Sequence, residues 1–190
     1  SLLPPLYKAL KAAKAKRNST VQIHPKSAQY FALTDIRTFV KLIGDHPVHC
    51  QQLIPGNPAY LGYCDACKYG AGGIWLSGLQ NIKPIVWRTQ WPPDIVDRVT
   101  SADLTINDLE MAGILLQYLL LEQLVPMLHL QTAVWCDNTS AVAWTTKMSS
   151  TKSLIGQQLT RALASRMITN RSSHLVALSI AGGNNFLADL

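Results

Sequence analysis

Two aspartates stand where a carboxylate can take part in metal chemistry, each at the end of a short apolar segment. Asp65 ends the run AYLGYCD and Asp137 ends the run TAVWCD. Side chains alternate along a strand, so each aspartate points to the face opposite the cysteine before it. If the two strands are neighbours, their carboxylates converge at the carboxyl ends, where ligand sites of open α/β sheets lie.

Two further acids belong to segments with helical character. Glu110 lies three residues after Asn107, near the start of the predicted helix 107–124, and Asp189 follows GGNNFLA. A capping box formed by Asn107 and Glu110 explains their three-residue spacing as well as a catalytic role of Glu110 does. For Asp189, the helix dipole alone favours an acid near a helix N-terminus.

Each acid alone has an ordinary structural explanation, but four at strand ends and first turns indicate a site. Clustered carboxylates raise one another's pKa unless a cation is present. Because all the ligands are oxygens, the expected cation is Mg²⁺ or Mn²⁺. The predicted catalytic and metal-binding residues are Asp65, Glu110, Asp137 and Asp189.

The sequence also contains a Cys-x-x-Cys motif, formed by Cys64 and Cys67. Zinc would need two further ligands, and the remaining Cys50 and Cys136 form no second pair. A thioredoxin-like motif would open a helix, whereas this one closes a strand. We therefore interpret the motif as incidental, and expect Cys64 and Cys136 to be small buried residues beneath the metal site.

The charge of the chain is unevenly distributed. Of its 190 residues 48% are hydrophobic and 15% charged, which is typical of a globular protein of one domain, with or without an appendage. Residues 1–20 hold five basic and no acidic residues, residues 138–190 hold five basic residues and one acid, and the middle is net acidic. Basic ends around an acidic middle suit a polyanion partner handled by metal-binding carboxylates, although a solvated surface explains any single lysine as well.

No targeting or membrane segment is predicted. The most apolar run, residues 112–130, is interrupted by polar residues and Pro126, and the first residues lack the apolar core of a signal peptide. Four cysteines without a secretory signal indicate reduced thiols and a cytoplasmic or nuclear protein. Because the chain begins with serine, we expect a fragment of a longer polypeptide.

The pattern of elements predicts a mixed α/β sheet with helices packed on it. Two helices, residues 5–17 and 27–44, precede a proline-containing linker. Three apolar or alternating runs then predict consecutive antiparallel strands. After the helix 107–124 the predicted elements are a buried strand at 132–137, helices at 138–147 and 152–168, a strand at 174–182 and the start of a last helix.

In this order, the segments GYCDACKYGAGG, TINDLEMAG, VWCDNTSAVAW and IAGGNNFLADL resemble the ribonuclease H domain of retroelement reverse transcriptases, of the long-terminal-repeat or tyrosine-recombinase (DIRS-type) class. The resemblance covers roughly residues 60–190. It implies a ribonuclease H-like five-stranded sheet, three strands antiparallel and two parallel, in residues 59–190, with the last helix truncated by the chain end. Residues 1–58 then resemble the basic helical tail and connection of the polymerase portion.

The resemblance implies hydrolysis of the RNA strand of RNA/DNA hybrids by two Mg²⁺ or Mn²⁺ ions, with Asp65 bridging both ions. The implied partners are the hybrid and the polymerase portion of the same polyprotein, and virus-like particles are one location that the resemblance implies. Hybrid contacts are expected from residues beside the acids and from nearby basic residues, although capping explains the polar ones equally. These residues are Asn107, Asn138, Thr139, Lys147, Lys152 and Arg161.

One departure from the family concerns its usual histidine, because Ser179 stands ten residues before Asp189, where many members carry that residue. Two other functions stay open. A non-catalytic domain of the same fold would hold the hybrid without binding a metal pair, and a DNA nuclease or integrase would act on duplex DNA.

Overall fold

The computed structural model describes residues 3–16, 20–45, 56–78, 82–128, 130–150, 153–170 and 173–188. Contacts divide the chain into two compact units, residues 1–47 and residues 48–190, and each is described by itself. Cys50, Lys152 and Asp189 lie outside the described residues. No helix in the described ranges is long and apolar enough to cross a membrane.

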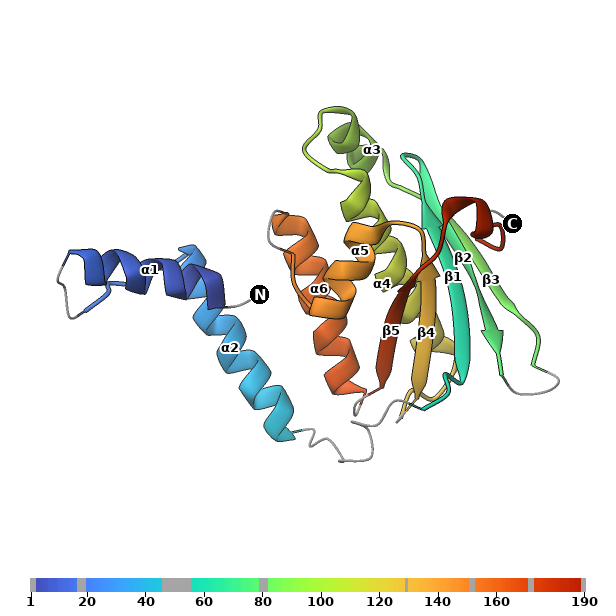
Figure 1. Cartoon of the computed structure of the whole chain (residues 1–190), viewed down its shortest axis with the longest axis horizontal. Helices are drawn as coiled ribbons and strands as arrows, with labels where there is room; N and C mark the ends of the chain where they lie inside the picture. Colours follow the sequence, from blue (N-terminus) through green and yellow to red (C-terminus); the bar gives the residue numbers. More distant parts are fainter. Residues whose placement is uncertain are drawn as a thin grey trace. The chain divides into compact units, whose positions relative to one another are not determined.

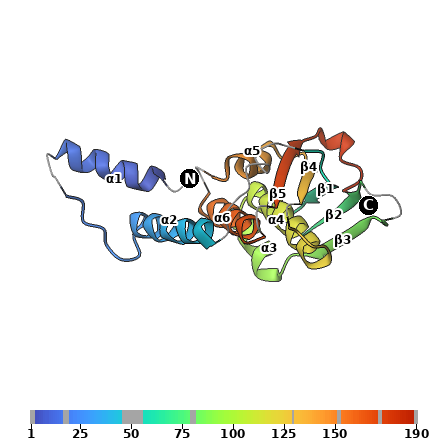
Figure 2. The ribbon, with the colours of Figure 1, turned by 90° about the horizontal axis from the view of Figure 1, so that it is seen from below.

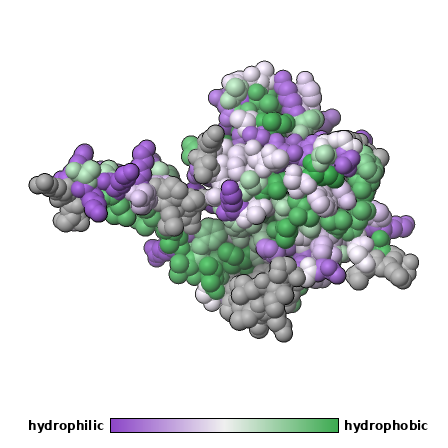
Figure 3. Space-filling view, in the orientation of Figure 1, coloured by the Kyte–Doolittle hydropathy of each residue, from purple (hydrophilic) through white to green (hydrophobic). Residues whose placement is uncertain are grey.

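The N-terminal unit consists of two helices, α1 (Leu3–Ala15) and α2 (Ala28–Asp45). Ser27 begins α2 as expected, because its Oγ accepts a hydrogen bond from the Tyr30 N–H at 3.1 Å. Only Ala32 of α2 is buried, and apolar side chains such as Phe31 and Val40 are exposed. Figure 3 shows hydrophobic side chains on the surface of this unit.

The second unit is built on the predicted mixed sheet of five strands, in the order β3-β2-β1-β4-β5 (Figure 1). β1, β2 and β3 pair antiparallel, whereas β4 pairs parallel to both β1 and β5. The strands are β1 (Tyr60–Ala66), β2 (Gly70–Ser77), β3 (Ile85–Gln90), β4 (Gln131–Cys136) and β5 (His174–Ser179). β1 and β4 are neighbours near the centre of the sheet. Because they run parallel, their carboxyl ends lie at the same edge.

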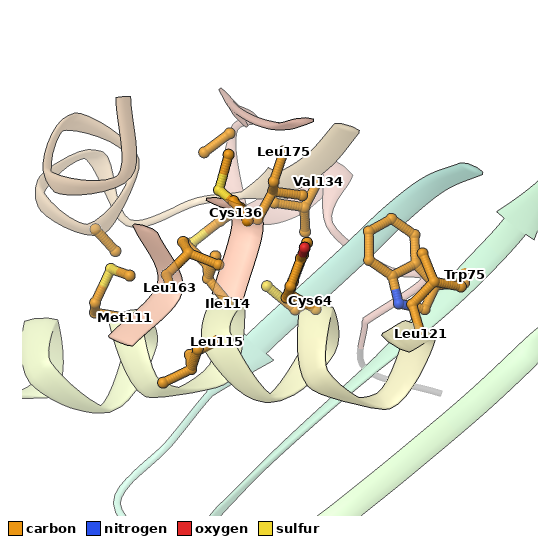
Figure 4. Close-up of a cluster of buried hydrophobic side chains, with 14 of the residues drawn as sticks. Cys64, Trp75, Met111, Ile114, Leu115, Leu121, Val134, Cys136, Leu163 and Leu175 are labelled. Carbon is orange, nitrogen blue, oxygen red and sulfur yellow. The ribbon is translucent and has the colours of Figure 1, made fainter. Parts of the chain in front are cut away.

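Helices cover one face of this sheet (Figures 1 and 2). α4 (Ile106–Leu124) packs on β1 and β2, α5 (Thr139–Lys147) packs on β5, and α6 (Leu154–Thr169) packs against α4. This arrangement explains why the buried residues of β1 alternate, since every second side chain faces α4. Cys64, Trp75, Met111 and Val134 are among the fully buried residues of the resulting core (Figure 4).

A buried glutamine joins α4 to the sheet. Gln117 is fully buried; its Nε2 donates to the Ile74 carbonyl at 2.8 Å and its Oε1 accepts from Trp87 Nε1. The Trp75 indole donates to the backbone carbonyl of the same glutamine at 2.8 Å. A Cβ at Gly73 would lie 2.6 Å from Gln117 Oε1 and 2.5 Å from the Tyr63 carbonyl, so only glycine lets α4 approach β2 this closely.

Three local expectations need correction. Helix α3 (Pro93–Thr100) was not expected, although Pro93 at its first position is a helix-start signal. The start of α4 is Thr105 with Asp108, which form the capping box instead of Asn107 with Glu110. After β5 the chain forms a short 3₁₀ helix, η2 (Gly182–Asn184), followed by a turn at 186–188, where the start of an α-helix was predicted.

Candidate functional site

The sheet brings three of the predicted acids to one edge. Asp65 lies near the end of β1, and Asp137 follows β4 directly. Glu110 lies in the second turn of α4 and reaches the same place, because α4 packs along β1. Both aspartates are half-buried, whereas only 4% of Glu110 is exposed.

Glu110 takes no part in capping α4, because Thr105 and Asp108 form the capping box. The Thr105 backbone N–H donates to Asp108 Oδ2 at 2.9 Å, and Thr105 Oγ1 donates to the same oxygen at 2.8 Å. Asp108 also accepts a hydrogen bond from the Ser153 hydroxyl at the start of α6. The Glu110 carboxylate is therefore left to point at the strand ends.

The charge of Glu110 is strongly disfavoured in this position. Burial, with the nearby charges of Cys136, Asp65 and Asp137, raises its pKa to about 9. The Cys136 thiol lies beneath this carboxyl group and donates to Glu110 Oε2 at 3.6 Å. A divalent cation beside these acids would offset their mutual repulsion and favour the ionised form of Glu110, so the donor set fits a divalent metal.

The two cysteines beneath the acids are fully buried, as expected. A hydrogen bond to Cys136, together with burial, raises the pKa of Cys64 well above its usual range, and the same bond lowers the pKa of Cys136. Cys67 is exposed, and its backbone carbonyl accepts from the Trp91 indole at 2.9 Å. The thiols of the Cys-x-x-Cys motif thus occupy different environments, which does not suit a shared zinc ion.

The segment leading to Asp189 passes the same edge. Asn185 is buried and donates to the Cys64 carbonyl at 3.1 Å. A Cβ at Gly182 would lie 3.0 Å from Asp137 Oδ2, and one at Gly72, the β2 partner of Asp65, would lie 3.8 Å from the Ala188 carbonyl. Sequence reasoning missed Asn185, for which the turn signal GGNN was the only hint.

The predicted hybrid-binding residues divide into two groups. Asn107, Thr139 and Lys147 line one hollow of about 530 Å³ between the starts of α4 and α6 and the helix α5. Asn138 instead caps α5, accepting from the Ala141 N–H at 3.0 Å and donating to Asn107 Oδ1 at 2.9 Å.

Two basic residues on α6 lie away from that hollow. Arg161 is half-buried and does not line it. Arg166, on the same helix, pairs with Glu122 at 2.6 Å. The predicted contact of Lys152 falls outside the described residues.

No protein-family model and no curated protein matches the sequence. Among solved structures, RNase H1 from the halophilic archaeon Halobacterium salinarum NRC-1 is similar, with a TM-score of 0.50 and 11% identity over 68% of this chain and 91% of that chain. LC11-RNase H1 from compost has a TM-score of 0.49 and 16% identity, over 70% of this chain and 91% of that chain. The protease-reverse transcriptase of prototype foamy virus has a TM-score of 0.44 and 10% identity, over 94% of this chain and 21% of that chain. The first similarity shows an RNase H-like fold.

Proposed function

We propose that this chain is a ribonuclease H, which hydrolyses the RNA strand of RNA/DNA hybrids. The observation that carries the proposal is that Asp65 and Asp137 stand at the carboxyl ends of two central parallel strands and both act electrostatically on Glu110, in an RNase H-like fold. The two alternative functions share this fold. A non-catalytic domain would bind no metal pair, and a DNA nuclease or integrase would act on duplex DNA.

The donor chemistry supports two Mg²⁺ or Mn²⁺ ions as cofactors. Asp65, Glu110 and Asp137 would hold them with oxygen ligands, and Asp189 is proposed as the fourth acid because residues 182–188 lead to the same edge. When bound, such a pair supplies Lewis acidity at the scissile phosphate. In the protein, Glu110 gives up its proton on metal binding, and the β1 and β4 backbones hold the aspartates in position.

The hybrid would run across the hollow beside the acids. Asn107 and Thr139 offer an amide and a hydroxyl to the 2′-hydroxyls or backbone, and Lys147, exposed at the end of α5, offers a charge to a phosphate. Asn138 would act by holding Asn107. Lys152 and Arg161 are proposed as further phosphate contacts.

The wider context is also a proposal. We place residues 1–58 as the basic tail and connection of a reverse transcriptase polymerase and residues 59–190 as its ribonuclease H domain, in a retrotransposon polyprotein of the cytoplasm or nucleus. The five basic residues and absence of acids in residues 1–20 favour a segment that lies near nucleic acid.

The direct test is cleavage of a labelled RNA/DNA hybrid in Mg²⁺ or Mn²⁺, beside duplex DNA and duplex RNA. The protein should cut only the RNA strand of the hybrid. Asp65→Asn, which keeps the shape of the side chain but removes its charge, should abolish cleavage. Asp94→Asn, at an exposed position on α3, is the matched control and should cut normally.

Two results would replace the proposal. Cleavage of duplex DNA would indicate a DNA nuclease or integrase. Hybrid binding without cleavage in either metal would indicate a non-catalytic domain. Ser179 is exposed at the end of β5. In the family that this sequence resembles, a histidine at this place is proposed to assist product release, so a Ser179→His variant should release product at least as fast as the native chain.

A further inference from the structure

A thiol belongs to the acidic group at the strand ends. Three possible ligand atoms lie within 4.8 Å of one another, one each from Glu110, Cys136 and Asp137. Cys136 and Glu110 are almost completely buried, while Asp137 is half-buried and connects the group to the surface. A magnesium ion does not use this thiol, because hard cations take oxygen ligands.

The spacing of the sulfur and the carboxylate is that of a soft-metal site. An ion bound tetrahedrally, at about 2.3 Å from sulfur and about 2.1 Å from oxygen, separates the two ligand atoms by about 3.6 Å. Cys136 Sγ and Glu110 Oε2 are 3.6 Å apart. The third ligand atom, a carboxylate oxygen of Asp137, lies at most 4.8 Å from the Cys136 sulfur and the Glu110 oxygen. A small side-chain movement would let it bind the same ion.

We propose that Glu110, Cys136 and Asp137 form a binding site for one thiophilic divalent ion, Zn²⁺ or Cd²⁺. The ion takes the place of the protons on the Cys136 thiol and the Glu110 carboxyl group, which are released to solvent on binding. Because the site shares Glu110 and Asp137 with the proposed hard-metal centre, Zn²⁺ or Cd²⁺ bound here excludes Mg²⁺ from those two acids. The proposal rests on the placement of the side chains and needs no hydrolytic activity.

The probe is Cd²⁺ added to the whole chain, followed by the ultraviolet charge-transfer band of the cadmium–thiolate bond and by proton release in weak buffer. The expected result is one saturable band at one ion per chain, with protons released as the ion binds. The band should be lost in Cys136→Ser and kept in Cys67→Ser, which removes the exposed thiol of the Cys-x-x-Cys motif. Circular dichroism checks that each variant is folded.

A second variant keeps the thiol and removes one carboxylate charge. Glu110→Gln should weaken Cd²⁺ binding by about tenfold or more, because the loss of even an outer-shell partner of a metal ligand lowers affinity by about 10–100-fold. The proposal is overturned if the native chain shows no band, if the band survives in Cys136→Ser or disappears in Cys67→Ser, or if Glu110→Gln binds with native affinity.

The outcome is separable from that of the proposed function. Hybrid cleavage in Mg²⁺, with soft metals removed by a chelator beforehand, measures the ribonuclease. A chain that binds Cd²⁺ through Cys136 but cuts no hybrid would contradict only the ribonuclease proposal. A chain that cuts hybrid but shows no thiolate band would contradict only the soft-metal site.

Discussion

At the scale of single residues, the acids at the strand ends are not equivalent. Asp65 and Asp137 are half-buried, whereas Glu110 is 4% exposed and has its pKa raised to about 9. Without a cation, Glu110 is the group that stays protonated near neutral pH. The charge balance of the site is thus decided mainly by whether Glu110 keeps its proton.

This difference predicts a pH-dependent stability in the metal-free protein. Because the pKa of Glu110 rises from 4.5 to about 9 on folding, the folded state binds the proton more tightly than the unfolded state does. Its contribution to stability is fully present below about pH 4.5 and is lost as pH rises towards 9. The melting temperature in chelator should therefore fall across this window.

Glu110→Gln supplies the comparison, because a neutral amide cannot titrate. Its melting temperature should change less across the same pH window, and saturating Mg²⁺ should reduce the fall in the native chain. Equal slopes for the two proteins in chelator would show that another group causes the dependence.

At the scale of elements, α4 decides whether the site forms, since it carries Glu110 and contacts the strands that carry both aspartates. Two polar connections hold this helix in place. Thr105 and Asp108 fix its start and connect it to α6 through Ser153, and Gln117 ties its middle to β2 and β3.

Removal of the capping side chain should destabilise the protein without disrupting its core. Thr105→Ala deletes the hydroxyl that accepts from the Asp108 N–H and donates to its carboxylate, and should lower the free energy of unfolding by about 1 kcal/mol. Urea unfolding measures the effect. The control, Thr146→Ala, removes an exposed hydroxyl within α5 that bonds only its own helix, and a decrease of similar size there would argue against a capping effect.

The buried glutamine should matter more than the cap. Gln117→Ala leaves the Ile74 carbonyl and the Trp87 indole without this partner, at about 1–3 kcal/mol for each group left unsatisfied, and adds a cavity. Gln123→Ala, at an exposed position of the same helix, should be nearly neutral. Urea unfolding that ranks the two variants equally would contradict the role given to Gln117.

At the scale of the whole molecule, charge and core belong to different parts of the chain. All residues of the described hydrophobic clusters come from residue 59 onward. Residues 1–20 contribute five positive charges and no acid. We therefore expect the N-terminal segment to add to nucleic-acid affinity more than to the core.

Removal of residues 1–17 should change how hybrid binding depends on salt. The slope of log affinity against log salt concentration becomes shallower by about 0.7–0.9 for every phosphate that the protein no longer neutralises, and the deletion takes away five basic side chains. Fluorescence anisotropy of a labelled hybrid at several salt concentrations measures the slope, with Asp65→Asn used so that the hybrid stays intact. An unchanged slope would show that this segment does not bind the hybrid.

Much of the fold was predictable because its signals are local. The alternation in β1, the apolar run of β4 and the periodicity of α4 are visible in short windows, and so is the position of Asp65 and Asp137 at strand ends. The sequence left a capping box of Asn107 with Glu110 open beside the catalytic role, because Asn107 and Thr105 are both suitable capping residues. Only the backbone angles show that the helix starts after Thr105.

By itself, the sequence determined the type and order of the main elements and the places of Asp65, Glu110 and Asp137 within them. Tertiary structure alone decided that β1 pairs with β4, that Glu110 turns inward to meet Cys136, and that Gly182 and Asn185 bring the last segment to the strand ends. These contacts join residues far apart in the chain, so they depend on packing and burial that no local pattern contains.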